Sequence, residues 1–144
     1  GITGALMPWS TIGINSDETT IAEVLKTRGY HTAAFGKWHV GNQREFLPLQ
    51  HGFDEYYGLP YSHDMWPVDF DGVPIHLRDT TSRLMRYPVL PLIEGNEKIG
   101  EITDLSGQDK LTAEYTRRAV EFIERHRKEP FFLYQIQIEL LYES

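Results

Sequence analysis

The sequence contains no cysteine, and none of its apolar runs is long enough to cross a bilayer. Without cysteine, the 144 residues cannot form a disulfide bond, a thiolate nucleophile or a cysteine-ligated metal site. The first residues also lack the charged segment followed by an apolar segment that is typical of a signal peptide. We therefore expect no membrane segment within the chain.

Positive charge is also scarce, since 14 Lys and Arg residues stand against 21 Asp and Glu residues and give a formal net charge of −7. A nucleic-acid-binding protein needs clustered basic side chains to neutralise phosphates. The densest basic stretch, residues 117–128, is interleaved with acidic side chains, namely Glu114, Glu121, Glu124 and Glu129. This interleaving is typical of a solvated helix face, so we expect no nucleic-acid partner.

Apolar side chains, in contrast, are plentiful enough for a folded core. The sequence is 40% hydrophobic, 24% charged and 12% aromatic, which is ordinary for a globular protein. Its length fits a single domain rather than two. We expect one hydrophobic core.

A helix followed by a strand is predicted near residue 20. Thr20 and Glu23 have the spacing of a capping box, and Ile21, Val24 and Leu25 follow with a helical period, which predicts one apolar stripe. Gly29 is expected to end the helix as a C-cap. Residues 30–35 are rich in aromatic and β-branched side chains and predict a buried strand.

A second helix and strand are predicted near the C-terminus. Residues 109–128 place apolar side chains on one face, namely Leu111, Tyr115, Ala119, Phe122 and Ile123. The other face carries acid-to-base pairs four residues apart: Glu114 with Arg118, Glu121 with Arg125, and Glu124 with Lys128. Pro130 ends the helix, and residues 131–134 predict a central, fully buried strand. The repeated order of helix and strand predicts a layered α/β fold.

Between these pairs, residues 41–107 sustain neither a helical nor a strand period, because Gly, Pro, Asn and Asp recur every few positions. So long an irregular stretch inside a domain is typical of functional loops. We expect active-site loops with short strands here.

A cation and a titratable ring lie two residues apart where the first predicted strand ends. If that strand continued to His39, the side chains of Lys37 and His39 would point to the same side and could grip one tetrahedral anion. Lysine would supply a fixed charge and histidine could move a proton near neutral pH. Taken alone, a Lys and a His near a strand end are most often surface residues.

Sequence blocks that follow one another in the order of a known family add weight to the anion site. Residues 36–41 (GKWHVG) resemble the second signature of the sulfatase family, and residues 19–26 (TTIAEVLK) resemble the helix before it. Residues 46–55 (FLPLQHGFDE) and 58–64 (GLPYSHD) are similar to the arylsulfatase A and N-acetylgalactosamine-6-sulfatase branch. Residues 121–124 (EFIE) and 130–134 (PFFLY) resemble a later helix and strand of the family.

The resemblance implies a fold related to alkaline phosphatase, with a mixed sheet between helices, and an enzyme that cleaves sulfate esters. It implies that Lys37 binds the sulfate oxygens and that His39 contacts a formylglycine hydrate and accepts a proton. It also implies that Ser62 hydrogen-bonds the sulfate or the substrate, although a serine in a loop can also cap a turn. His63 and Asp64 are weaker candidates, and His51 is expected to pack beside Gly52 and Phe53.

The resemblance also implies groups that this chain does not supply. The nucleophile of the family lies just upstream of a Thr-Gly like the one at residues 3–4, and the serines Ser10 and Ser16 lack its sequence context. A calcium ion is implied in the parent enzyme with ligands outside this chain, because Asp64, Asp69 and Asp71 have the irregular spacing of solvated carboxylates. We assign no metal ligand within the chain.

We therefore expect residues 1–144 to be part of an N-terminal catalytic sulfatase domain, truncated at both ends. Residues 135–144 contain no histidine, unlike the family pattern, and alternate in a way that could either continue the strand or reflect an altered reading frame. The expected partner is a sulfated small molecule or glycan, and the oligomeric state is left open. Family resemblance implies a lysosomal, periplasmic or secreted location. Two alternatives remain: an inactive remnant that binds sulfated glycans, and a phosphatase or phosphodiesterase, which the motif at residues 36–41 disfavours.

Overall fold

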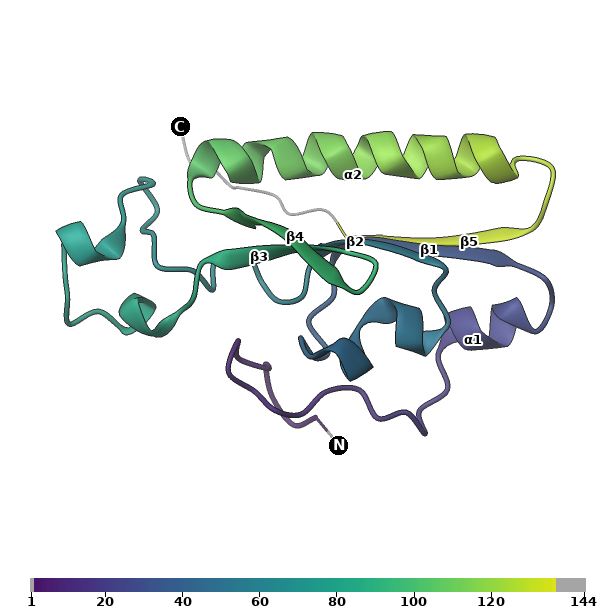
Figure 1. Cartoon of the computed structure of the whole chain (residues 1–144), viewed down its shortest axis with the longest axis horizontal. Coiled ribbons are helices and arrows are strands. Elements are labelled where there is room, and N and C mark those ends of the chain that lie inside the picture. The colour runs from purple at the N-terminus through teal and green to yellow at the C-terminus, as the bar shows by residue number, and fades with distance from the viewer. Residues whose placement is uncertain (1, 137–144) are drawn as a thin grey trace.

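The computed structural model describes residues 2–136, and within them a mixed sheet lies between helices on its two faces (Figure 1). The strands are β1 (His31–Lys37), β2 (Glu55–Leu59), β3 (Leu90–Glu94), β4 (Glu97–Ile102) and β5 (Phe131–Ile136), and the strand order is β4-β3-β2-β1-β5. β2, β1 and β5 run parallel, and the β3–β4 hairpin joins β2 in the antiparallel sense. The predicted α/β class is confirmed.

Two α-helices cover opposite faces of this sheet (Figure 1). α1 spans Ile21–Lys26 and α2 spans Leu105–His126. Four short 3-10 helices punctuate the connection between β1 and β3, at Arg44–Phe46, Pro48–His51, Ile75–Leu77 and Arg83–Arg86. The prediction of loops with short strands at residues 41–107 is confirmed for most of that stretch. None of the helices in the described part of the chain has the length and apolar character needed to span a membrane.

α1 has both of its predicted ends. The Thr20 amide donates to Glu23 at 2.7 Å while the Glu23 amide donates to the Thr20 hydroxyl at 3.1 Å, which completes the capping box. At the other end, Gly29 has φ +79° and donates to the Lys26 carbonyl, while Tyr30 donates to that of Leu25. These two bonds form a Schellman motif, so Gly29 terminates the helix as predicted.

The predicted apolar stripe of α1 is wrong for Ile21 and Val24, whereas Leu25 is half-buried. Ile21 and Val24 are 67% and 50% exposed, and the buried residue of this helix is Ala22. The α1 backbone packs closely against Gly52, where an added Cβ would lie 2.8 Å from the Ala22 carbonyl carbon. Ala22 takes the buried position of the helix, and Ile21 and Val24 are exposed.

α2 begins earlier than predicted, at Leu105 rather than Asp109, because Asp104 is its N-cap and accepts a bond from the Gly107 amide at 2.8 Å. It ends at His126. The predicted buried face is confirmed for Leu111, Tyr115, Ala119 and Phe122, whereas Ile123 is 40% exposed. These side chains pack on β1 and β2, with edge-to-face contacts from Tyr115 to Tyr57 and from Phe122 to Phe35.

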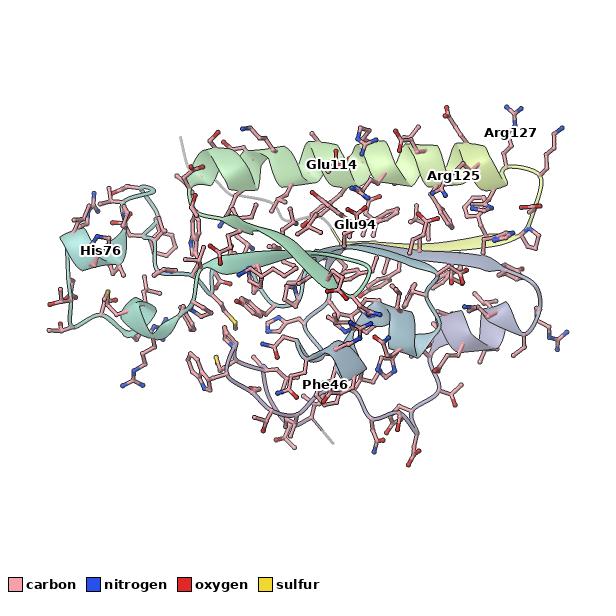
Figure 2. The ribbon with its side chains drawn as sticks, in the orientation of Figure 1. Phe46, His76, Glu94, Glu114, Arg125 and Arg127 are labelled. Carbon is pink, nitrogen blue, oxygen red and sulfur yellow. The ribbon has the colours of Figure 1, made fainter. Side chains whose placement is uncertain are left out.

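Of the three predicted acid-to-base pairs on α2, only Glu114 with Arg118 forms within the described residues. Arg125 instead points from α2 toward the sheet (Figure 2) and binds both carboxylate oxygens of Glu55 at 2.8 Å. Glu121 pairs with Arg117. Sequence spacing could not reveal these partners, because the carboxylate nearest to Arg125 comes from a strand.

Residues 131–134 form a strand as predicted, but it is not fully buried, and within the described residues it is not central. Among the described residues, β5 pairs only with β1 and is the last strand of the order. Its side chains are partly exposed, with Tyr134 at 39%. Of the tail predicted at residues 135–144, residues 135 and 136 continue β5, and the rest lies outside the described residues.

Candidate functional site

Lys37 and the segment after β2 meet at one edge of the sheet. Because β1 and β2 are parallel, their carboxyl ends lie together, and Lys37 pairs in register with Leu59. Ser62 and His63 follow directly after β2. Ligands of open α/β sheets bind outside the carboxyl ends of the strands, so this edge is the natural place for a site.

The ammonium group of Lys37 lies on the side of β1 that faces α2. Ala33 and Phe35, which alternate with it along the strand, belong to the core beneath α2. Within residues 2–136, Lys37 makes no ion pair and no side-chain hydrogen bond, although it lies close enough to His63 for its charge to lower the pKa of that ring. Lys37 is thus a half-buried cation whose donors are available to an anion.

His39 does not extend the strand, so the prediction that it shares a strand face with Lys37 is wrong. β1 ends at Lys37, and His39 has φ +62°, a left-handed conformation that costs a non-glycine residue about 1–2 kcal/mol. The backbone amides of Trp38 and His39 still donate to the carbonyls of Leu59 and Pro60. The chain therefore turns away from β1 at His39 while its backbone stays hydrogen-bonded to the segment at the end of β2.

The ring of His39 reaches the N-terminal segment, where its Nε2 lies 3.0 Å from the carbonyl oxygen of Leu6. A carbonyl only accepts, so Nε2 carries the proton and a neutral ring has its lone pair on Nδ1. His39 therefore has one nitrogen committed to positioning and one able to accept a proton.

Ser62 and His63 form the other side of this edge. The carbonyl of Ser62 accepts a bond from the Met65 amide at 3.1 Å, so the backbone of Ser62 makes a turn, while its hydroxyl has no partner in the described part of the chain. Burial lowers the pKa of His63, Asp64 works against that shift, and Lys37 adds to it. The structure brings Lys37 near His63, and the hydroxyl of Ser62 remains free to bind a ligand.

A cavity of about 220 Å³ lies beside His63. Its polar lining residues besides His63 are Asp64, Asp69, Arg83 and Gln108, and its apolar and aromatic ones are Trp66, Val68, Phe70, Leu84, Tyr87 and Leu105. Gln108 is only 5% exposed, and its amide nitrogen donates to the His63 carbonyl at 3.1 Å. Its Oε1 is buried without a hydrogen-bond partner among the described residues, so the cavity contains an unused acceptor.

Sequence analysis missed Gln108 because it lies before the predicted start of the helix. Had Asp104 been taken as the N-cap, Gln108 would have fallen on the same helix face as Leu111 and Tyr115. A glutamine on a buried face is unusual, and this was the available signal.

The remaining predicted residues have structural roles. His51 is 1% exposed, contacts the carbonyl of Glu45 at 3.2 Å and stacks on Trp38, which confirms that it packs inside. Asp71 is solvated as predicted, but the side chain of Asp69 is only 12% exposed, so that part of the prediction is wrong. Asp69 accepts hydrogen bonds from the amides of Asp71 and Val73 and pairs with Arg78. These contacts hold the loop in which Asp69 lies.

These contacts also test whether the described residues could hold a calcium ion at this edge. Calcium needs six to eight oxygen ligands, and the carboxylates of Asp69 and Asp71 are both engaged by Arg78. The group of His, Asp and Glu side chains found to converge in the described chain lies at the opposite end of β1 and contains two histidines. Asp69 and Asp71 therefore do not fit a calcium site, and Asp64 alone offers too few oxygen ligands.

Comparison with known proteins identifies relatives over nearly the whole chain. The sulfatase family model matches residues 2–139. Arylsulfatase G of Mus musculus is 39% identical over 147 residues, which cover 93% of this chain and 27% of the relative. N-acetylgalactosamine-6-sulfatase of Mus musculus is 38% identical over 127 residues, which cover 85% of this chain and 22% of the relative. The chain thus spans about a quarter of the length of these curated relatives.

Solved structures of sulfatases share this fold. The crystal structure of the PsFucS1 sulfatase from Pseudoalteromonas sp. superposes with a TM-score of 0.69 at 26% identity, over 90% of this chain and 28% of that one. The predicted partial alkaline-phosphatase-like fold, with its mixed sheet and flanking helices, is confirmed at this level.

Proposed function

The chain belongs to the sulfatase family, and from this premise we propose that the protein containing it hydrolyses sulfate esters. The observation that carries the proposal is the half-buried ammonium of Lys37, which makes no ion pair within residues 2–136 and lies at the carboxyl edge of the sheet. Ser62 follows β2 at the same edge, and its hydroxyl has no partner among those residues. A fixed cation and a hydroxyl donor at such an edge suit the tetrahedral oxygens of a sulfate ion or of a sulfate monoester.

In this proposal three residues of the chain act on the sulfate group. Lys37 binds the sulfate oxygens and stabilises the charge that develops on them, and Ser62 donates a hydrogen bond to the sulfate or to the substrate. His39 accepts a proton at Nδ1, because its Nε2 proton is held by the Leu6 carbonyl. The positive φ at His39 is consistent with a backbone strained to aim a functional ring.

The nucleophile in this proposal is a formylglycine, which lies outside the described residues, and the cofactor is calcium with ligands outside them as well. Calcium would supply positive charge at the nucleophile. We assign no step to this ion, because the carboxylates described here are committed to other partners.

The substrate in this proposal is an aryl or carbohydrate sulfate. The cavity beside His63 offers aromatic walls, the carboxylates of Asp64 and Asp69, the guanidinium of Arg83 and the unused acceptor of Gln108, a combination that suits a hydroxylated ring. N-acetylgalactosamine-6-sulfatase, one of the relatives, is named for a sulfated amino sugar. A lysosomal, periplasmic or secreted location belongs to the same proposal.

The test is sulfate release by the full-length protein from an aryl sulfate and from a 6-sulfated amino sugar, with the matching phosphate esters as controls. Mass spectrometry of the active-site peptide checks for the aldehyde. We expect sulfate release and little phosphate release. Release of phosphate alone would favour the phosphatase alternative, and a protein with a confirmed aldehyde that binds sulfated glycans without turnover would favour the binding remnant.

A further inference from the structure

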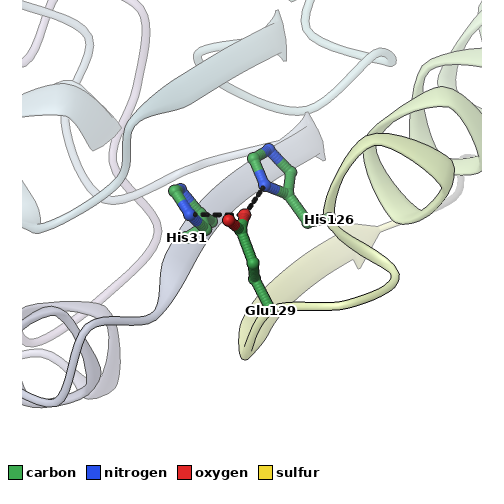
Figure 3. A group of neighbouring side chains, drawn as sticks. All are labelled: His31, His126 and Glu129. Atoms are coloured by element: carbon green, nitrogen blue, oxygen red, sulfur yellow. Dashed lines mark hydrogen bonds and ion pairs between the residues drawn. The ribbon is translucent and has the colours of Figure 1, made fainter.

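Three metal-binding side chains converge at the amino end of the sheet, far from the edge just described. His31 begins β1 and Lys37 ends it, which separates them by about 20 Å at roughly 3.3 Å per residue. The Nε2 of His31 lies 3.0 Å from Oε2 of Glu129, and the Nδ1 of His126 lies 3.3 Å from the same oxygen (Figure 3). All three ligand atoms lie within 4.8 Å of one another.

The backbone fixes these three residues in rigid positions. His31 is the first residue of β1, and its amide donates to the Pro130 carbonyl at 3.0 Å. His126 is the last residue of α2, and its carbonyl accepts from the Glu129 amide at 2.9 Å, which closes the turn between α2 and β5. The ligands therefore come from a strand, a helix end and a short turn that are bonded to one another.

The two rings also pack together. The ring of His126 packs against the buried ring of Phe122 at 4.8 Å, and the imidazole of His31 stacks on it with centroids 4.0 Å apart. An imidazole binds a metal in its own plane, so the His31 ring, which is 43% exposed, must turn out of the stack to share an ion with His126. Packing against Phe122 limits the rotamers of His126, whose side chain is only 16% exposed. Glu129 is more exposed, so its carboxylate can adjust to a ligand.

The spacing of the donor atoms fits a small divalent ion. Bonds of about 2.0–2.1 Å in a tetrahedron place neighbouring ligand atoms about 3.4 Å apart. The two nitrogen–oxygen separations of 3.0 and 3.3 Å are close to that value, and the two nitrogens lie within 4.8 Å of each other, a separation that turning of the His31 ring can change. Two imidazole nitrogens and one carboxylate oxygen suit zinc, whereas calcium takes oxygen ligands in larger number.

We propose that His31 Nε2, His126 Nδ1 and the Glu129 carboxylate bind one Zn²⁺ ion, with a fourth position for water. The site is distinct from the candidate active site and independent of the proposed function. Bound zinc ties the end of α2 to the start of β1 and stabilises this corner, because it binds the folded state in preference to the unfolded chain.

The experiment uses the full-length protein, stripped of metal with a chelator and titrated with Zn²⁺ by calorimetry, with thermal unfolding measured in parallel. His126→Ala and Glu129→Gln each remove one ligand. Loss of a residue that merely supports a ligand weakens metal binding about 10–100-fold, so we expect each variant to bind zinc at least about tenfold more weakly. We also expect zinc to raise the Tm of the wild type and to raise that of the variants less.

His76→Ala is the matched control, since His76 is an exposed histidine in the distant loop region (Figure 2). It should bind zinc as the wild type does. Co²⁺ substituted for zinc should give an absorption spectrum of a four-coordinate site in the wild type and lose it in His126→Ala. Calcium at millimolar concentration should not displace zinc.

Equal zinc affinity in the wild type, His126→Ala and Glu129→Gln would overturn the proposal, as would an equal loss in His76→Ala. Glu129→Gln keeps the size of the side chain on an exposed turn, so it distinguishes a lost ligand from a failure to fold. Sulfate release measured on the same samples separates the two proposals. Loss of zinc binding in a variant that still releases sulfate supports the zinc site as separate from the active site, and zinc binding in a protein that releases no sulfate contradicts only the proposed function.

Discussion

The two ends of the sheet differ in how completely their polar groups are paired. At the amino end, Lys26 binds Asp54 at 2.7 Å and Arg125 binds both oxygens of Glu55. At the carboxyl end, Lys37 has no ion pair within the described residues, and Gln108 buries an acceptor that is unused there. Buried polar groups are nearly always satisfied, and a ligand bound at the carboxyl end would satisfy both of these groups.

Backbone strain follows the same division. His39, at the carboxyl end, is the non-glycine residue with positive φ in the described chain. At the amino end the left-handed position is occupied by Gly29, which adopts it without cost. The carboxyl end is thus less favourable to the fold alone, as expected where function rather than stability sets the residues.

The largest effect that separates the two ends is expected from His39→Asn in the full-length enzyme. Asparagine tolerates the left-handed backbone better than other non-glycine residues, so the variant removes the ring with little change in strain. Loss of general acid–base catalysis should lower the rate of sulfate release about 100- to 10,000-fold, while affinity for a non-hydrolysed sulfated ligand changes little. The control is His76→Asn, and turnover equal to the wild type in His39→Asn would remove the catalytic role.

Lys37→Ala should lower kcat/KM about 100- to 1,000-fold, the usual loss when a charge aimed at developing oxyanions is removed. Lys26→Ala is the matched control, because it removes the same charge from the amino end, where Asp54 already pairs with it. Steady-state kinetics of both variants compare the ends directly. Similar losses in the two would mean that Lys37 is no closer to the sulfate than Lys26 is.

Asp54→Ala tests the amino end, where we expect a loss of stability rather than of catalysis. Asp54 accepts from the amide of Thr32 at 2.9 Å and from its hydroxyl at 3.1 Å, and Thr32 is fully buried. Removing an acceptor from a buried donor costs about 1–3 kcal/mol, measured as the free energy of unfolding in urea. Catalytic parameters of the folded variant should match those of the wild type, and a selective loss of kcat would contradict the division between the ends.

Gln108→Leu should raise KM about 3- to 10-fold with kcat little changed, because a hydrogen bond to a non-reacting part of the substrate is worth about 0.5–1.5 kcal/mol. The measurement compares a simple aryl sulfate with a sulfated sugar, and only the sugar should be affected. Thr116→Val, about two turns further along α2 and exposed, is the control. A fall in kcat with both substrates would instead indicate that Gln108 acts by positioning His63, whose carbonyl it binds.

The smallest effect is expected midway along α2, at Glu114. Hydrogen bonds from Arg117 and, after the opposing effect of burial, from Arg118 lower the pKa of Glu114 from 4.5 to about 2. A depressed pKa contributes stability that is present above pH 4.5 and is lost as the pH falls toward 2. Because these are surface pairs, the loss should be about 1 kcal/mol or less. Urea unfolding at pH 6 and pH 3 should show a smaller difference for Glu114→Gln than for the wild type, with Glu124→Gln as control.

Local sequence determined the elements whose signals lie within a few residues of one another. The capping box of Thr20 and Glu23, the terminating Gly29, and the buried face from Leu111 to Phe122 were all predicted correctly. The first two depend on bonds between neighbours in the chain, and the third on a helical period of apolar side chains, so spacing alone reveals all three. The motif at residues 36–41 also located the edge where Lys37 lies.

Tertiary structure decided where the chain meets itself. Sequence spacing assigned Arg125 to Glu121, whereas packing of α2 on the sheet gives it Glu55. It placed His39 in line with Lys37, whereas the turn at φ +62° carries its ring to Leu6. Gln108 beside His63, and His31 beside His126, are likewise contacts between segments far apart in sequence. No local pattern encodes such pairs, because the partners become neighbours only after α2 packs across the parallel strands.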